Sequence, residues 1–190
     1  MYYGLVYYPK VNNKLINQIR KKYDPTVDLI EPHIGIMFPV PESVGEGELV
    51  RHIENVLRHW KPFPIRIRGF QKSWDHWLFL TLEEGNSDVI RLYRQIYTGI
   101  LAKYRRDDID FVPHITLGLF VKERTRYDFN NPQQLDFDEQ KYRQALGEAE
   151  APGLDFKCIV DKLHLVKLTD DFSRIVRSQE FPLCGPEAHE

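Results

Sequence analysis

Two short segments of the chain carry the same pattern, and this echo constrains the fold more than any other feature. Residues 32–36 read PHIGI and residues 113–117 read PHITL, so His33 and His114 stand 81 positions apart. In each copy a proline and a histidine open an apolar run typical of a β-strand. The echo predicts two related halves that bring two histidine-bearing strands together across a cleft.

The alternation of side chains along a strand assigns the residues of both copies to faces. On the first strand we expect one polar face to carry His33, Gly35 and Met37. On the second strand we expect the matching face to carry a longer set: His114, Thr116, Gly118 and Phe120. The opposite faces are apolar and are predicted to pack under helices.

The remaining periodicities predict an α+β domain. Period-two patterns predict strands over 2–8, 33–38, 63–71, 77–82, 114–121, 156–167 and 173–181. Helical spacing predicts helices over 13–23, 46–60, 87–104 and 138–150. Because several strands are consecutive, we expect antiparallel or mixed sheets with helices on their outer faces. We expect one domain over residues 1–182 and a flexible tail over 183–190.

Length, charge and cysteine content exclude several classes of protein. A chain of 190 residues is long enough to bury a sizeable core. Its formal net charge of −2 argues against a protein that grips duplex nucleic acid over its whole surface. The two cysteines, Cys158 and Cys184, have no zinc-ligand spacing. No signal peptide or membrane span is apparent, so we expect a cytoplasmic protein. We also expect a protein without a metal or a cofactor.

Two histidines facing each other suit acid–base chemistry at a phosphate. An imidazole has an unperturbed pKa of about 6.5, so one ring can be neutral while the other is protonated. The neutral ring would accept a proton from water or a hydroxyl, and the protonated ring would donate one to the leaving oxygen. The hydroxyl of Thr116, two residues after His114, is predicted to bind a phosphate oxygen.

At these residues the sequence resembles the two-histidine (2H) phosphoesterase superfamily. The family motif, His-x-Thr/Ser-x, occurs twice about 80 residues apart, and the copy at 114–117 fits it fully. The opening strand, the segment 21–25 and the segment 29–33 resemble the YjcG-like branch, which is 2′-5′ RNA ligase-like. The resemblance implies a bilobal, pseudo-symmetric α+β fold with outer helices, in which the motif strands face a central cleft.

The resemblance also implies a function. We expect a metal-independent cyclic phosphodiesterase or 2′-5′ RNA ligase-like hydrolase that acts on 2′,3′-cyclic phosphates or 2′-5′ phosphodiester bonds. Its catalytic pair would be His33 and His114. Its partners would be RNA ends or a small cyclic-phosphate nucleotide, without a membrane, and we expect a monomer.

Gly35 departs from the family motif, because it stands where a hydroxyl residue is usual. A backbone N–H at this position could still contact phosphate, and a larger substrate group could approach closely. The alternative function is therefore an RNA- or nucleotide-binding module whose catalysis is weakened or lost.

Other residues are weaker candidates for the site. Lys122 and Arg126 follow the second motif strand and are predicted to contact substrate. Several further residues have a functional and a structural interpretation, and they are the basic residues Arg66, Arg68 and Lys72, the aromatic residues Trp74, Trp77 and Tyr127, and the acidic residues Asp107, Asp108 and Asp110. His164 is interpreted as a histidine on a strand surface.

Overall fold

The computed structural model describes residues 1–123 and 135–185. The strands are β1 (Tyr2–Tyr7), β2 (Ile34–Pro41), β3 (Phe63–Lys72), β4 (Trp77–Glu84), β5 (His114–Leu119), β6 (Phe156–Val160), β7 (Lys162–Leu168) and β8 (Ile175–Pro182). The α-helices are α1 (Asn13–Tyr23), α2 (Glu46–Leu57), α3 (Asn86–Ile96) and α4 (Glu139–Glu150). Two short 3-10 helices are η1 (Glu42–Val44) and η2 (Gly99–Tyr104). These elements confirm the predicted α+β class.

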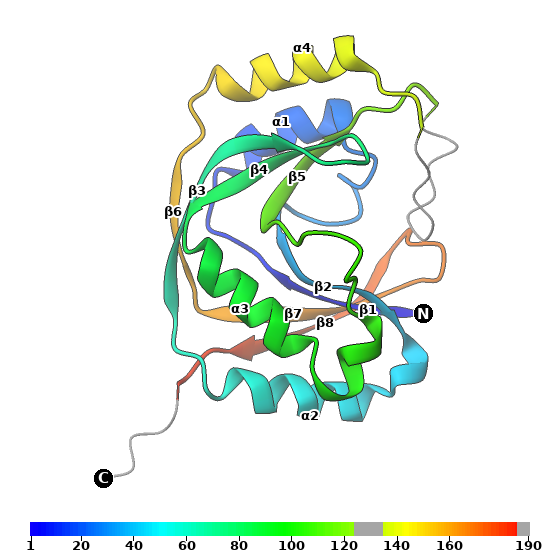
Figure 1. The fold of residues 1–190 in the computed structure, drawn as a ribbon, viewed down its shortest axis with the longest axis vertical. Helices are drawn as coiled ribbons and strands as arrows, with labels where there is room; N and C mark the ends of the chain where they lie inside the picture. The colour runs from blue at the N-terminus through cyan, green and yellow to red at the C-terminus, as the bar shows by residue number, and fades with distance from the viewer. Residues whose placement is uncertain (124–134, 186–190) are drawn as a thin grey trace.

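All eight strands belong to one sheet, in the order β6-β3-β4-β5-β2-β1-β7-β8, and every pairing is antiparallel. The sheet therefore divides into two four-stranded halves that meet where β5 lies beside β2. Each half begins with a motif strand and continues outward through three more strands. The sheet curls between two helical layers, with α1 and α4 at one end and α2 and α3 at the other (Figure 1).

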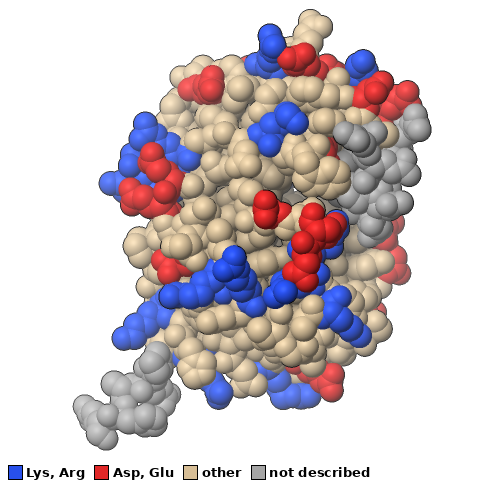
Figure 2. Space-filling model, viewed as in Figure 1, with Lys and Arg blue, Asp and Glu red and all other residues tan. Residues whose placement is uncertain are grey.

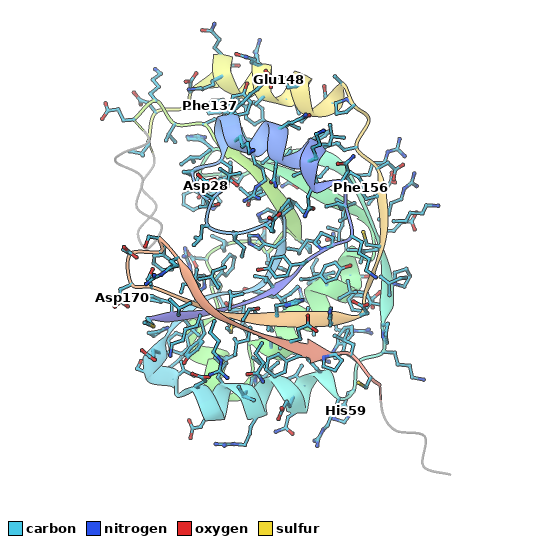
Figure 3. All side chains as sticks on the ribbon, turned by 180° about the vertical axis from the view of Figure 1, so that it is seen from behind. Asp28, His59, Phe137, Glu148, Phe156 and Asp170 are labelled. Atoms are coloured by element: carbon cyan, nitrogen blue, oxygen red, sulfur yellow. The ribbon has the colours of Figure 1, made fainter. Side chains whose placement is uncertain are left out.

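The helices cross between the halves. α1 follows β1 along the chain but packs on β5, whereas α3 follows β4 but packs on β2. α4 lies over α1, and from behind the helix α1 is seen between the sheet and α4, on which Glu148 is labelled (Figure 3). The core face of the sheet, defined as the side that packs on the helices, shares one hydrophobic cluster across both halves.

Local sequence explains where the helices start and stop. The side chain of Asn12 accepts a hydrogen bond from the Leu15 amide (3.1 Å) and so caps α1. Arg20, Lys21 and Lys22 in the last turn stabilise the helix C-terminus through its dipole. Asp138 caps α4 in the same way, through the Lys141 amide (3.1 Å).

Two predicted elements proved to be divided. The helix predicted over 87–104 ends at Ile96, and η2 begins at Gly99, whose φ of 52° breaks the helical geometry. The strand predicted over 156–167 is interrupted at Asp161. Before Asp161, β6 pairs with β3, and after it β7 pairs with β1 in the other half. The chain therefore crosses between the halves at this point, although the apolar alternation in the sequence is continuous.

A β-bulge follows the motif in both motif strands. On β2, Gly35 pairs with Val6 and Met37 pairs with Leu5, so Ile36 is an extra residue. On β5, Thr116 pairs with Phe79 and Gly118 pairs with Leu78, so Leu117 is the extra residue there. The bulges occupy the same motif position in both halves, which supports the pseudo-symmetry at the level of single residues.

These bulges correct the predicted faces, because an extra residue shifts the rest of a strand to its other side. Met37 joins Ile34 and Ile36 in the core instead of lying beside Gly35. Phe120 is likewise part of the core cluster, and a Cβ on Gly118 would lie 2.5 Å from the Cβ of Tyr23 on α1. The predicted polar faces are therefore wrong beyond Gly35 and Thr116.

The division into one domain over 1–182 and a tail over 183–190 stays a prediction. Within the described part, Leu183 is buried and the Gly185 amide donates a hydrogen bond to the Trp60 carbonyl (2.7 Å). The described chain is thus anchored three residues beyond Pro182.

Candidate active site at the junction of the motif strands

β2 and β5 are joined by the antiparallel pairing of Ile34 with Ile115, the residues that directly follow the two histidines. Both isoleucines point into the core, so the residues flanking them lie on the opposite, open face of the sheet. Positions on either side of an antiparallel pair also face each other. The junction therefore forms a motif square of two facing pairs, His33 with Thr116 and Gly35 with His114.

The two histidines are diagonal corners of the motif square. Diagonal partners in an antiparallel pair lie about 7–8 Å apart at the backbone, which leaves the rings within reach of one small anion. All four corners are half-buried. The arrangement places two imidazoles and one hydroxyl on a single surface.

Each histidine makes the same hydrogen bond to the chain. Nδ1 of His33 lies 2.9 Å from the carbonyl oxygen of Glu31, and Nδ1 of His114 lies 2.6 Å from that of Val112. A carbonyl only accepts hydrogen bonds, so Nδ1 carries the proton in both rings. The Nε2 atom therefore presents a lone pair in the neutral ring and an N–H group in the protonated ring, as acid–base work requires.

Both rings are held neutral at pH 7 when the site is free. Burial lowers the pKa of His33 to about 4, against the opposing effect of its hydrogen bond to the Glu31 carbonyl. Burial also lowers the pKa of His114 to about 4, with a further lowering from the charge of His33. The effect of His33 on His114 agrees with the short distance between the two rings across the motif square.

Aromatic side chains from the neighbouring strands flank the histidines. Phe79 on β4 stacks on His114, with ring centroids 3.4 Å apart and planes at 18°. Tyr8, at the end of β1, approaches His33 edge-on at 6.4 Å. The ring of His164 on β7 lies 4.9 Å from that of Tyr8, so it belongs to the same group of ring side chains beside His33.

Phe79 and Tyr8 flank the histidines without having been indicated by the sequence, and His164, interpreted from the sequence as a histidine on a strand surface, lies beside Tyr8. Phe79 lies on the strand that pairs with the second motif strand, in register with Thr116. The sequence alone does not show this pairing. Tyr8 directly follows Tyr7, which pairs with Ile34, and this places Tyr8 beside His33.

Gly35 opens a space at its corner of the motif square. A Cβ built on Gly35 would meet no heavy atom within 4 Å, and the residue has no positive φ that would require glycine. Neither packing nor backbone geometry explains the glycine. The missing side chain leaves room on the open face beside His33.

The other predicted site residues lie elsewhere. Lys122 is exposed and follows the far end of β5, and Leu119 at that end lies about 16 Å from His114 at the usual strand rise. Lys122 is thus not brought to the histidines. Arg126, like Tyr127, lies outside the described residues.

Most of the basic and acidic candidates form ion pairs with charged residues outside the candidate set. Arg66 forms a bidentate ion pair with Asp155 (2.9 and 2.7 Å). On the face shown in Figure 2, basic side chains gather in the lower half with acidic side chains close by. Arg105 pairs with Asp107 (2.6 Å), and Arg106 pairs with Asp108 (2.6 Å). Across residues 1–123 and 135–185, no group of three His, Cys, Asp or Glu could hold a metal ion.

Comparison with known proteins identifies the family. The sequence profile described as "2'-5' RNA ligase superfamily" matches residues 8–172. The chain belongs to the 2′-5′ RNA ligase superfamily. This match confirms the resemblance to the 2H phosphoesterases that the two motifs carry.

Two proteins similar to this chain are provisionally named phosphoesterases. One from Halalkalibacterium halodurans is 28% identical over 179 residues, covering 91% of this chain and 92% of its own length. One from Geobacillus thermodenitrificans is 25% identical over 169 residues, covering 87% of each chain. The structure of E. coli LigT complexed with 3′-AMP shares the fold, with a TM-score of 0.51 and 15% identity over 96% of this chain and 94% of LigT.

Within residues 1–123 and 135–185 of this chain, every helix is too short or too polar to span a lipid bilayer.

The lowered histidine pKa values predict that the protein loses stability in mild acid. An unfolded histidine titrates near 6.5, so protonation favours the unfolded chain as the pH falls from about 6.5 towards 4. Each pKa unit corresponds to about 1.4 kcal/mol before solvent screening is discounted. We expect the free energy of unfolding in urea to fall over this range, and to fall less in a His33→Gln/His114→Gln variant. Parallel curves for the two proteins would contradict the shifts.

Proposed function

We propose that the protein is a metal-independent phosphoesterase that opens 2′,3′-cyclic phosphates or cleaves 2′-5′ phosphodiester bonds. The observation that supports this most directly is the motif square, in which two histidines with free Nε2 atoms flank a single hydroxyl. A phosphate over the square would contact both rings at once. The shared fold of LigT and the names of the sequence relatives agree with a phosphate ester as substrate.

The proposed reaction divides the work between the two rings. One histidine in its neutral form takes a proton from the attacking water at Nε2, and oxygen attacks phosphorus. The other histidine, protonated at Nε2, donates its proton to the ribose oxygen as the P–O bond breaks. The hydroxyl of Thr116 donates a hydrogen bond to a non-bridging phosphate oxygen and stabilises the charge that develops there.

Because both rings are neutral in the free protein, the negative charge of the substrate is needed to protonate one of them. Both histidines have pKa values of about 4 in the absence of ligand. An anionic phosphate beside them favours the charged form of an imidazole and therefore raises its pKa. In this proposal the substrate itself recruits the proton that the general acid later donates.

RNA ends and small cyclic nucleotides are the proposed substrates. LigT has been solved with 3′-AMP, a nucleotide with a phosphate on its ribose. The open space at Gly35 would admit the sugar or the following nucleotide beside His33. Ligation is the reverse of 2′-5′ bond cleavage by the neighbouring 3′-hydroxyl: a 5′-hydroxyl attacks the cyclic phosphate, the 2′-5′ bond forms and the 3′-oxygen leaves with a proton.

The test is to incubate the purified protein with 2′,3′-cyclic nucleotides, with and without EDTA, and to follow the ring-opened product. We expect turnover that EDTA does not change. Loss of turnover in EDTA would overturn the metal-independent mechanism. Absence of product from every mononucleotide and from RNA ending in a cyclic phosphate would overturn the proposed activity.

The alternative is a nucleotide-binding module, and Gly35 is the observation that favours it. The first motif lacks the side-chain donor that Thr116 supplies in the second, so phosphate is held from one side only. A binding module would bind the cyclic nucleotide in calorimetry without releasing product. The same incubation therefore separates the two functions.

Replacing Gly35 shows what the open space is for. The Cβ of a Gly35→Thr side chain meets no heavy atom within 4 Å, and the substitution adds a hydroxyl at the fourth corner of the motif square. If the hydroxyl alone matters, we expect a lower KM for a small cyclic mononucleotide, by about tenfold for one hydrogen bond to a charged group. If the space holds a substrate group, the small substrate improves but RNA ending in a cyclic phosphate is cleaved more slowly. Kinetics on both substrates measure this, and equal values for both proteins would refute both roles. Gly147→Ala on α4, where a Cβ also meets nothing within 4 Å, is the control.

A further inference from the structure

A buried ion pair lies at the end of α1, on the chain that leads to the first motif. Nε of Arg20 lies 2.8 Å from Oδ2 of Asp24, and the two side chains are 2% and 0% exposed. Two charges removed from water in this way cost free energy that their attraction recovers only with further hydrogen bonds. A pair of apolar side chains would usually fill the same space at no loss of stability. The pair therefore calls for a role other than stability.

The further hydrogen bonds of this pair hold the segment from residue 24 to residue 30. Oδ1 of Asp24 accepts from both the amide and the hydroxyl of Thr26, each at 2.8 Å. Nη2 of Arg20 donates to the carbonyl oxygen of Ile30 at 2.9 Å. The two charged groups thus fix the start and the end of the segment.

From Ile30 the constraint reaches the catalytic candidate in one step. The next carbonyl along the chain, that of Glu31, is the one that accepts the hydrogen bond from Nδ1 of His33. Glu31 precedes Pro32, which confines its backbone to extended conformations, and the ring of Pro32 fixes the φ angle before His33. Holding the Ile30 carbonyl therefore sets the direction of the Glu31 carbonyl and, through it, the orientation of the imidazole.

In the second half of the sheet, His114 makes the same kind of hydrogen bond, but a different interaction holds the chain before it. Nδ1 of His114 bonds to the Val112 carbonyl, and a proline again lies between them. The residue before this carbonyl, Phe111, stacks on Tyr93 with ring centroids 4.0 Å apart and planes at 7°. An aromatic stack thus stands where the first half has an ion pair, so a change at Arg20 should reach one histidine only.

We propose that Arg20 and Asp24 are positioning residues for His33, an inference that rests on the catalytic role proposed above for this histidine. Their charges also reach the ring, because Arg20 lowers and Asp24 raises the pKa of His33 after the larger effects of burial and of the Glu31 carbonyl. By fixing the direction of the Glu31 carbonyl, the pair holds His33 with its proton on Nδ1 and its lone pair on Nε2.

The test separates positioning from stability by comparing three variants. Arg20→Met leaves Asp24 charged and unpaired, so it lowers the melting temperature strongly. Arg20→Met/Asp24→Asn removes that charge and keeps an oxygen for Thr26, so the melting temperature recovers, but the Ile30 carbonyl stays without its donor. Arg20→Lys keeps the charge but loses the forked geometry that reaches three partners, Asp24, Asn17 and the Ile30 carbonyl. Lys22→Met is the matched control, because Lys22 lies on the same helix as Arg20 and forms an exposed ion pair with Glu148 on α4.

We expect the double variant and Arg20→Lys to lose about 10²-fold in kcat on a 2′,3′-cyclic nucleotide, as for a misplaced catalytic group, while Lys22→Met keeps wild-type kcat. Long-range ¹H–¹⁵N spectra of the histidine rings give a readout that a merely structural role would not move. In both variants the His33 signals should change to a mixture of tautomers, while those of His114 keep the proton on Nδ1.

A double variant with recovered melting temperature, wild-type kcat and an unchanged His33 tautomer would overturn the positioning role. Equal changes in His33 and His114 would also overturn it, because they would indicate general loosening. If the wild-type protein turns over no cyclic phosphate, the proposed function fails. The tautomer of His33 then decides the positioning role by itself.

Discussion

His33→Ala and His114→Ala should each lower kcat for a 2′,3′-cyclic nucleotide by about 10²–10⁴-fold, the usual contribution of one proton transfer. Each ring has its own partner carbonyl and its own free Nε2, so neither can take over the work of the other. The double variant should be scarcely slower than either single variant, because a reaction without one of its two proton transfers gains little from the other. Steady-state kinetics with purified variants measure this.

His59→Ala is the matched control for both changes. His59 follows α2, at the opposite end of the molecule from α4 (Figure 3), and it is exposed. Its removal should leave kcat unchanged. A His33 or His114 variant with wild-type turnover would show that the motif square is not the reaction centre.

The pH dependence should differ between the free protein and its substrate complex. The ratio kcat/KM reports ionisations of the free protein, where both pKa values are about 4, so the protonated acid is scarce at pH 7. We expect kcat/KM to rise by about tenfold per pH unit as the pH falls from 7 towards 5. The optimum of kcat should lie nearer neutrality, because the bound anion raises the pKa of the ring that must be protonated.

Initial rates over this pH range need a parallel check of folding by circular dichroism, because the same protonation destabilises the protein. A 2′,3′-cyclic phosphate keeps its charge between pH 5 and 7, so the substrate adds no titration of its own. A kcat/KM profile that is flat from pH 7 to 5 would contradict the assignment of a histidine as the acid.

The helix and strand periodicities predicted the α+β class, and the echo of the two motifs predicted which residues share a face with each histidine. Alternation along a strand is a local rule, so it correctly placed His33 with Gly35 and His114 with Thr116. The rule failed at Met37 and Gly118, because bulges depend on how two distant strands pair. A single sequence contains no direct signal of that register.

The contacts that orient the histidines were beyond the reach of local patterns for the same reason. Phe79 and Tyr8 flank the rings only because β4 lies beside β5 and β1 beside β2. Arg20 was visible merely as one of several basic residues at the end of a helix. Its burial, and hence its place in the site, follows from the packing of α1 against the other half of the sheet.

The crossing of α1 and α3 has a consequence for folding. The half that contains His33 receives the cover of α3 from the chain after β4, and the half that contains His114 receives α1 from the chain after β1. Neither stretch of chain therefore encodes a self-sufficient folding unit. Chains cut between β3 and β4 should regain structure only when both fragments are mixed. The spacing between the two imidazoles is thus a property of the whole cooperative fold, acquired in the same step in which the protein becomes native.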